Sequence, residues 1–131
     1  MAGDAPAGPA LALLERAAIA RGHRVADAMV KRAPVELLRC DPVSPGKFLV
    51  LVGGEVASVD EAFREGLALA LSGSDDGVLD RLYLPYAHEQ LPAALRGEAR
   101  AGAGVDALGV VETKTVAATI LAADAAVKGA V

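Results

Sequence analysis

The chain has 131 residues and a formal net charge of −4, and 53% of its residues are hydrophobic although only 3% are aromatic. This length fits one domain with a core of Ala, Val and Leu, and because Ala buries little area we expect another subunit to cover part of it. The acidic balance disfavours a nucleic-acid partner, and the single Cys40 excludes an intramolecular disulfide. No uncharged apolar stretch has the length of a membrane span. Together these features predict a soluble intracellular protein with no membrane contact.

The opening of the chain predicts a leader, a strand and a helix. Residues 1–9 are mainly Ala, Gly and Pro and are expected to form a flexible leader. Leu11–Leu14 is an apolar run that fits a strand buried on both faces, although it also fits a buried helix. From Ile19 to Lys31 apolar residues recur at helical spacing, and Pro34 then prevents the helix from continuing.

Two strands and a second helix are expected next. Val35–Cys40 and Phe48–Val52 are rich in branched residues and are strand candidates, with a stiff loop of two prolines and a glycine between them. Ser58 and Glu61 have the spacing of a capping box, so we expect a helix from there to about Leu71.

The next residues complete one unit. Val78–Leu84 predicts a fourth strand and Ala87–Leu95 a short helix. The order β-α-β-β-α-β defines an α/β (α+β) domain over residues 10–96, a ferredoxin-like split βαβ unit with helices on one face of an antiparallel sheet. Residues 97–105 are rich in Gly and Ala and are interpreted as a linker.

A repeated pattern indicates that a second unit begins near Asp106. Ala-Asp-Ala-x-Val-Lys-x-Ala starts at Ala26 and again at Ala123, 97 positions later. At the same separation, Ala10, Leu11 and Glu15 return as Ala107, Leu108 and Glu112. Residues 106–131 are therefore predicted to be the truncated start of a second unit, with a strand at Leu108–Val111 and a helix at Val116–Lys128.

The repeat singles out Lys31 and Lys128, which hold the same place in each copy. A lysine near a helix C-terminus is usually solvated and favourable to the helix dipole. Its repetition favours instead a contact lysine whose apolar stem packs flat against a symmetry-related copy.

The loop Val43–Lys47 lacks the spacing of a phosphate-binding P-loop. It fits a plain hairpin turn. In a ring of such units it also fits a constriction, in which the exposed amides of Ser44 and Gly46 would contact anionic or hydroxylated solutes.

The sequence contains no catalytic constellation that we recognise. His88 and His23 have no Cys or carboxylate at metal-ligand spacing, so packing or an interface hydrogen bond is expected for His88. Cys40 has no identifiable base and is interpreted as an apolar filler. We therefore expect no enzymatic activity, no metal and no cofactor.

Taken together, these motifs resemble the shell proteins of bacterial microcompartments, the BMC-domain family. In the second copy the resemblance rests on Leu108–Lys114 and Ala122–Lys128, and in the first on Val25–Lys31 and Val35–Leu37. Resemblance to the tandem-domain, trimer-forming class rests on Pro42–Lys47, Gly54–Val56 and Leu84–Leu91.

The resemblance implies a structural protein of a cytoplasmic organelle. Discs that are hexagonal in outline, built from six single domains or three tandem pairs, would tile a shell wall around a central pore for small metabolites. By position, the pore loop would be Val43, Ser44, Pro45 and Gly46, the disc edge would carry Lys31 and Lys128, and Pro85, Tyr86 and His88 would reach neighbouring subunits. Its partners would be copies of itself, other shell proteins and small metabolites.

An incomplete second unit leaves three arrangements open. The chain is a shortened tandem protein, or its fragment packs on the first domain of a neighbour, or six whole units form a ring. A function of another class also fits the fold, because an oligomeric ferredoxin-like unit can serve as a small-molecule-binding regulatory module.

Overall fold

The structure is a computed structural model that describes residues 8–73, 77–98 and 100–130. Seven residues of the expected leader, residues 1–7, lie outside this range. In chain order the described residues form β1 (Ala10–Arg16), α1 (Ile19–Arg32), β2 (Glu36–Val43), β3 (Lys47–Gly54), α2 (Val56–Leu71), β4 (Val78–Leu84), α3 (Leu91–Leu95) and α4 (Val116–Gly129). The expected order β-α-β-β-α-β is therefore confirmed for the first unit.

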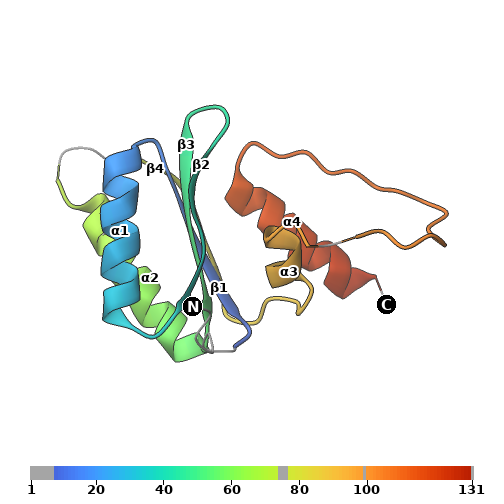
Figure 1. Ribbon diagram of the computed structural model, residues 1–131, viewed down its shortest axis with the longest axis horizontal. Helices are drawn as coiled ribbons and strands as arrows, with labels where there is room; N and C mark the ends of the chain where they lie inside the picture. Colours follow the sequence, from blue (N-terminus) through green and yellow to red (C-terminus); the bar gives the residue numbers. More distant parts are fainter. Residues whose placement is uncertain (1–7, 74–76, 99, 131) are drawn as a thin grey trace.

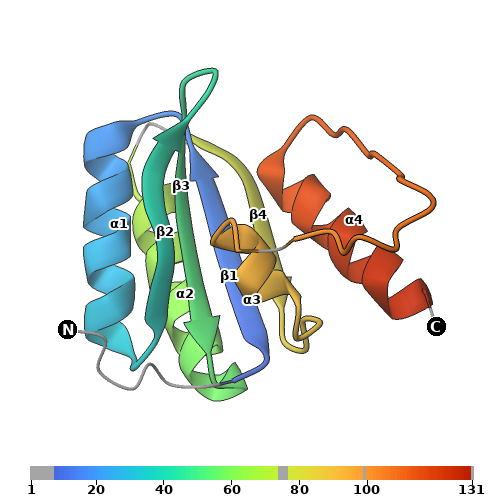
Figure 2. The same ribbon diagram turned by 45° about the vertical axis from the view of Figure 1, so that its right-hand side comes forward.

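The four strands form one sheet in the order β2-β3-β1-β4, and every neighbouring pair is antiparallel (Figure 2). The β2–β3 hairpin extends to the pair Val43 and Lys47, so both strands are longer than the sequence indicated. Pro42 lies inside β2 without breaking the sheet, because β2 is the edge strand of the sheet that the described residues form.

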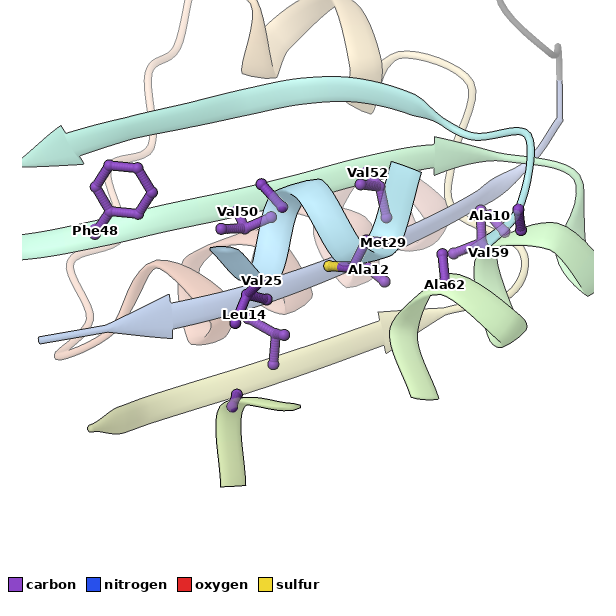
Figure 3. Packing of buried hydrophobic residues seen from close by; sticks show 13 residues of the cluster. Ala10, Ala12, Leu14, Val25, Met29, Phe48, Val50, Val52, Val59 and Ala62 are labelled. Atoms are coloured by element: carbon purple, nitrogen blue, oxygen red, sulfur yellow. The ribbon is translucent and has the colours of Figure 1, made fainter. Parts of the chain in front are cut away.

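One face of the sheet, called here the near face, is covered by α1 and α2. Alternate residues of β1 and β3 point to it and pack on Val25 and Met29 of α1 and on Val59 of α2 (Figure 3). The strand residues of this core are Ala10, Ala12, Leu14, Phe48, Val50 and Val52. Its large side chains include Phe48 and Met29 beside the expected Val and Leu.

The opposite face, called the far face, is also apolar and is covered by α3 and α4 (Figure 2). The intervening residues of β1 and β3 point to it together with one residue of β4, and α3 contributes Leu91 while α4 contributes Ala117 and Ile120. The strand residues are Leu11, Leu13, Leu49, Leu51 and Leu82. Because β1 pairs with both β3 and β4, the Leu11–Leu14 run is confirmed as a strand buried on both faces rather than a helix.

Of the strand and helix predicted for the second copy, only the helix forms. Helix α4 forms and corresponds to α1 at both ends with the same separation of 97 positions. The strand predicted at Leu108–Val111 does not form, and residues 105–111 are exposed. A strand needs a hydrogen-bonded neighbour, and here these residues have none, so their backbone stays in water.

The capping box predicted at Ser58 and Glu61 is wrong. Helix α2 begins earlier, at Val56, with Glu55 as N-cap and no side-chain cap. Val59 is fully buried in the near-face core and Val56 packs against it, so burial extends the helix ahead of Ser58.

Within the described ranges, every helix falls short of the length or apolar content needed to cross a membrane.

Two helical glycines let α1 approach its neighbours closely. A Cβ at Gly22 would lie 2.2 Å from Cδ1 of Phe48, and one at Gly66 of α2 would lie 2.6 Å from the Met29 side chain. The first contact is with a ring enclosed in the core, which has little room to move.

We predict that Gly22→Ala lowers the unfolding free energy by about 1–2 kcal/mol, because the strain of moving Phe48 exceeds the gain of about 1 kcal/mol in helix propensity. Urea denaturation measures this change. The matched substitution Gly129→Ala, at a helical glycine with no atom within 4 Å of the added Cβ, should leave stability unchanged or slightly higher. Equal stability of the two variants would contradict the close packing of Gly22.

Candidate functional site

The tip of the β2–β3 hairpin projects beyond the sheet and is the first candidate site (Figure 1). Ser44, Pro45 and Gly46 are exposed there, while Val43 is half-buried against the far-face core. The Ser44–Pro45 peptide bond is cis, and Gly46 has a φ of 83°, a conformation that glycine adopts without strain. The tip therefore offers one hydroxyl and several backbone polar groups to the solvent.

A fully buried carboxylate connects this hairpin to helix α4. Glu15 of β1 accepts a hydrogen bond from the amide of Ala117 through Oε1, and its Oε2 lies 3.4 Å from Nζ of Lys47. Nζ of Lys47 also donates to the carbonyl of Lys114, at 2.9 Å. One ion pair thus fixes the base of the hairpin tip, the start of α4 and the sheet relative to one another.

The N-terminus of α4 has a second anchor on β4. Oγ1 of Thr115 accepts a hydrogen bond from the amide of Ala118 and donates one to Oδ2 of Asp80, at 2.6 Å. Thr115 is therefore a side-chain N-cap that is itself held by another element.

The C-terminal half of α4 holds the segment that follows β4. Oδ1 of Asp124 accepts a hydrogen bond from the backbone amide of His88, at 2.8 Å. Nζ of Lys128 donates to Oδ2 of Asp124 and to the carbonyl of Tyr86, at 2.7 and 2.6 Å. Three residues singled out from the sequence, Lys128, Tyr86 and His88, therefore meet at one place, while Pro85 lies beside them, half-buried.

The polar groups around Asp124 change its acidity. Burial disfavours the charged carboxylate, but the hydrogen bonds from Lys128 and from the His88 amide outweigh it, so the pKa of Asp124 is lowered from its ordinary value. Asp124 is consequently ionised at neutral pH and holds Lys128 and the 86–88 segment as a charged acceptor.

Helix α1 carries the same pair of residues on an open face. Lys31 donates to Oδ2 of Asp27 at 2.7 Å, as Lys128 does to Asp124, but both α1 side chains are more than half exposed. The docked lysine, Lys128, keeps 47% of its side chain exposed. The two copies thus share a local geometry and differ in what covers them.

The fold brings His23 and Cys40 together, a contact that their spacing in the sequence does not indicate. Nδ1 of His23 lies 3.7 Å from Sγ of Cys40. Burial, and then the nearby Asp41, raise the pKa of the Cys40 thiol, so the thiol is not activated as a nucleophile. The other histidine, His88, accepts a hydrogen bond from the amide of Gln90 through Nδ1.

Glu15, Asp80 and Asp124 were not assigned a role from the sequence. For two of them a signal existed, because Glu15 is repeated as Glu112 and Asp124 repeats Asp27. Among the residues that the structure describes, no three His, Cys, Asp or Glu side chains are grouped as a metal site would require.

Comparison with known proteins agrees with this architecture. The family model of the BMC domain matches residues 10–85, which is more than half of the chain. The chain therefore belongs to the BMC-domain family.

Its similarity extends to particular relatives. The chain is 43% identical over 122 residues to the bacterial microcompartment shell protein PduT of Citrobacter freundii, a match that covers 91% of this chain and 62% of that protein. It is 34% identical over 89 residues to a probable carboxysome shell protein of Prochlorococcus marinus, over 68% of this chain and 43% of the relative. The chain thus spans about three-fifths or less of the length of these relatives.

A solved structure shares the fold. A microcompartment protein from Desulfitobacterium hafniense superposes with a TM-score of 0.74 at 36% identity, over 93% of this chain and 65% of that one. The match covers more of the chain than the first unit alone.

We predict that Glu15→Ala lowers the unfolding free energy by about 2–3 kcal/mol, because it leaves the Lys47 ammonium and the Ala117 amide without their carboxylate. Amide hydrogen exchange in α4 should rise more than in α1. The matched variant Glu112→Ala removes the exposed counterpart in the second copy and should leave stability unchanged. Equal effects of the two substitutions would contradict a role of Glu15 in docking α4.

We also predict that Asp124→Asn makes stability less sensitive to acid. Because the folded pKa is lowered, the carboxylate stabilises the fold above about pH 4, and this contribution is lost as the pH falls through the lowered pKa. Urea denaturation at several acidic pH values should therefore give a shallower loss of unfolding free energy for Asp124→Asn than for the parent chain. Identical slopes would contradict the assignment.

A control for this substitution lies on α1. Asp27→Asn changes the same residue type at the exposed counterpart, and it should leave the unfolding free energy at neutral pH nearly unchanged. Asp41, whose pKa is lowered by its hydrogen bonds to Arg39, is present in all these chains and contributes equally to each acid profile.

Proposed function

We propose that the chain is a structural shell protein of a bacterial microcompartment, a non-enzymatic tile that assembles with copies of itself and with other shell proteins. The observation that carries this proposal is the docking of α4 on the far face. Helix α4 repeats α1 of the first unit, so the chain contains one contact between two successive units. Repetition of such a contact from unit to unit is how a ring or a tile is built.

Residues 106–131 are, in this proposal, the opening part of a second BMC unit of the tandem class. The face of α4 that corresponds to the buried face of α1 includes Ala123 and Ala126, and these line an open apolar groove beside α3. In α1 the equivalent positions are covered by the strands of its own unit. The relative from Citrobacter freundii is longer than this chain, and its extra length leaves room for a completed second unit.

The hairpin tip Val43–Gly46 is proposed as the pore loop. Its position at the free end of the sheet and its exposed Ser44 support contact with small hydrophilic metabolites that cross the shell. The ion pair of Glu15 and Lys47 keeps the base of this loop in a fixed position, as a constriction of defined width requires.

Lys31 and Lys128 are proposed as edge residues and Pro85, Tyr86 and His88 as interface residues. The exposed stem of Lys128, whose ammonium is held by Tyr86, supports a lysine that lies along a subunit surface. The similarity to shell proteins favours a shell role for the chain, within a cytoplasmic organelle, over the alternative role of a regulatory module that binds small molecules. Expression together with other shell proteins, followed by electron microscopy of the purified particles, tests the proposal, and persistent exclusion of the chain from every shell would overturn it.

We predict that Lys31→Ala weakens the lateral assembly of discs while leaving the discs intact, because the substitution removes the stem that packs at the edge. Negative-stain microscopy distinguishes sheets from single discs. The matched control is Arg64→Ala on α2, which removes a similarly exposed cation paired with the acid four residues before it. Loss of sheets in both variants, or in neither, would contradict the edge assignment.

A further inference from the structure

Polar side chains interrupt the apolar far face of the sheet where it meets the start of α4. Glu15 of β1 lies opposite Asp80 of β4 in the strand register. Lys47 of β3 lies two residues before Leu49, which is a far-face residue, so Lys47 points to the same side. The three charged side chains therefore form a row across three strands at this end of the sheet.

The two carboxylates of this row hold the start of α4. Glu15 accepts a hydrogen bond from the amide of Ala117, and Asp80 accepts one from the hydroxyl of Thr115, which caps the helix. A helix N-terminus carries amides that have no partner within the helix, together with the positive end of the helix dipole, so carboxylates are favourable there. The position of this end of α4 is therefore set by directed polar contacts as well as by apolar burial.

Lys47 connects the same end of α4 to the β2–β3 hairpin. It forms the last pair of the hairpin ladder with Val43, so its backbone lies at the base of the tip. Its Nζ donates to the carbonyl of Lys114 at 2.9 Å and lies 3.4 Å from Oε2 of Glu15. In Figures 1 and 2 the start of α4 and the hairpin tip lie toward the same end of the sheet. Lys47 thus contacts the sheet and the segment that leads into α4 at the same time.

The tip itself lies in solvent. Ser44, Pro45 and Gly46 are exposed, and a Cβ added at Gly46 would meet no described atom within 4 Å. Val43, at the base of the tip, packs on the far-face cluster to which α4 contributes. A segment with few buried contacts opens easily unless a neighbouring element holds it. The base of this tip is held on the surface that α4 covers.

We propose that Lys47 is a positioning residue that couples the hairpin tip to the docking of α4. When the start of α4 leaves the sheet, the Lys47 ammonium loses the carbonyl of Lys114, and Glu15 loses the amide of Ala117. The pair of Lys47 and Glu15 is then open to water, which weakens it. The tip keeps its position only while α4 occupies the far face. This inference rests on the proposed function, in which the tip is the pore loop, and specifies how that loop is regulated.

The coupling acts in both directions, because a coupling free energy between two sites is reciprocal. A solute that binds the tip in its ordered position also stabilises α4 on the sheet. Since α4 repeats α1, the pore loop of the first unit responds to whether the opening helix of the second unit is in place.

Substitutions at the two ends of this link separate their effects. Lys47→Met removes the ammonium and keeps an unbranched apolar stem, whereas Lys47→Arg keeps a charged donor that reaches both oxygens. Thr115→Ala removes the helix cap and the hydrogen bond to Asp80 without changing the hairpin. Thr115→Ala therefore loosens the start of α4 from a position that is not part of the tip.

The test is amide hydrogen exchange, resolved by NMR, in α4 and in the last hairpin pairs, residues 41–43 with 47–49. Thr115→Ala should raise exchange about 5-fold or more at the start of α4 and by a similar factor in these hairpin pairs. In a Lys47→Met background, the same substitution should raise exchange in α4 but not in the hairpin. In a Lys47→Arg background the joint response should return. Amides of α1, on the near face, should not respond in any of these chains.

Lys128→Met is the matched control, because it loosens the other end of α4, where Nζ of Lys128 holds Asp124 and the carbonyl of Tyr86. It should raise exchange at the His88 amide and leave the hairpin pairs protected. Hairpin pairs that do not respond to Thr115→Ala, or that respond equally with and without the Lys47 ammonium, would overturn the proposal. A hairpin response to Lys128→Met as large as the response to Thr115→Ala would also overturn it, because the loosening would then not pass through Lys47.

These measurements use the free chain and do not depend on entry into a shell. Absence of the coupling in a chain that still enters shells would overturn this inference and leave the shell role intact. A chain that shows the coupling but is excluded from every shell would overturn the proposed function, and the link between α4 and the hairpin would remain a property of the fold.

Discussion

A sheet with apolar side chains on both faces must be covered on both faces, and this constraint governs the molecule. The strand residues that point to the near face are buried by α1 and α2, whereas those that point to the far face depend on α3 and α4. Burial of a leucine contributes about 1.5–3 kcal/mol, so five leucines left in water would remove much of the stability of a domain this small. The first unit therefore depends on a helix that its own β-α-β-β-α-β order does not include.

The local order of the fold could be predicted from the sequence because apolar periodicity, proline and glycine specify it directly. The strand Val78–Leu84 and the position of α1 followed from such patterns, and the repeat located α4. The capping box at Ser58 failed because burial of Val59 extended the helix ahead of the local signal. The strand at Leu108–Val111 failed because a strand requires a hydrogen-bonded neighbour, which no local pattern reports.

The candidate site was less predictable, because its contacts join residues far apart in the chain. Glu15 and Ala117 are separated by 102 positions, and His88 and Asp124 by 36. The repeat marked Glu15 and Asp124 as special, but only the docked position of α4 gives each of them a partner. The pairing of His23 with Cys40 had no signal at all, since it follows from the packing of α1 beside an edge strand.

The long connection between α3 and α4, which is exposed over residues 100–112, determines how firmly the repeat helix stays in place. A covalent connection of this kind gives α4 an effective concentration on the order of 1 mM at the far face of the sheet, whatever the concentration of the protein. Dilution therefore does not release α4, and an identical helix from another molecule would need to reach a similar concentration before it could compete for the far face. The occupancy of that face is thus a property of the single chain, set by the length of its connection rather than by the amount of protein present.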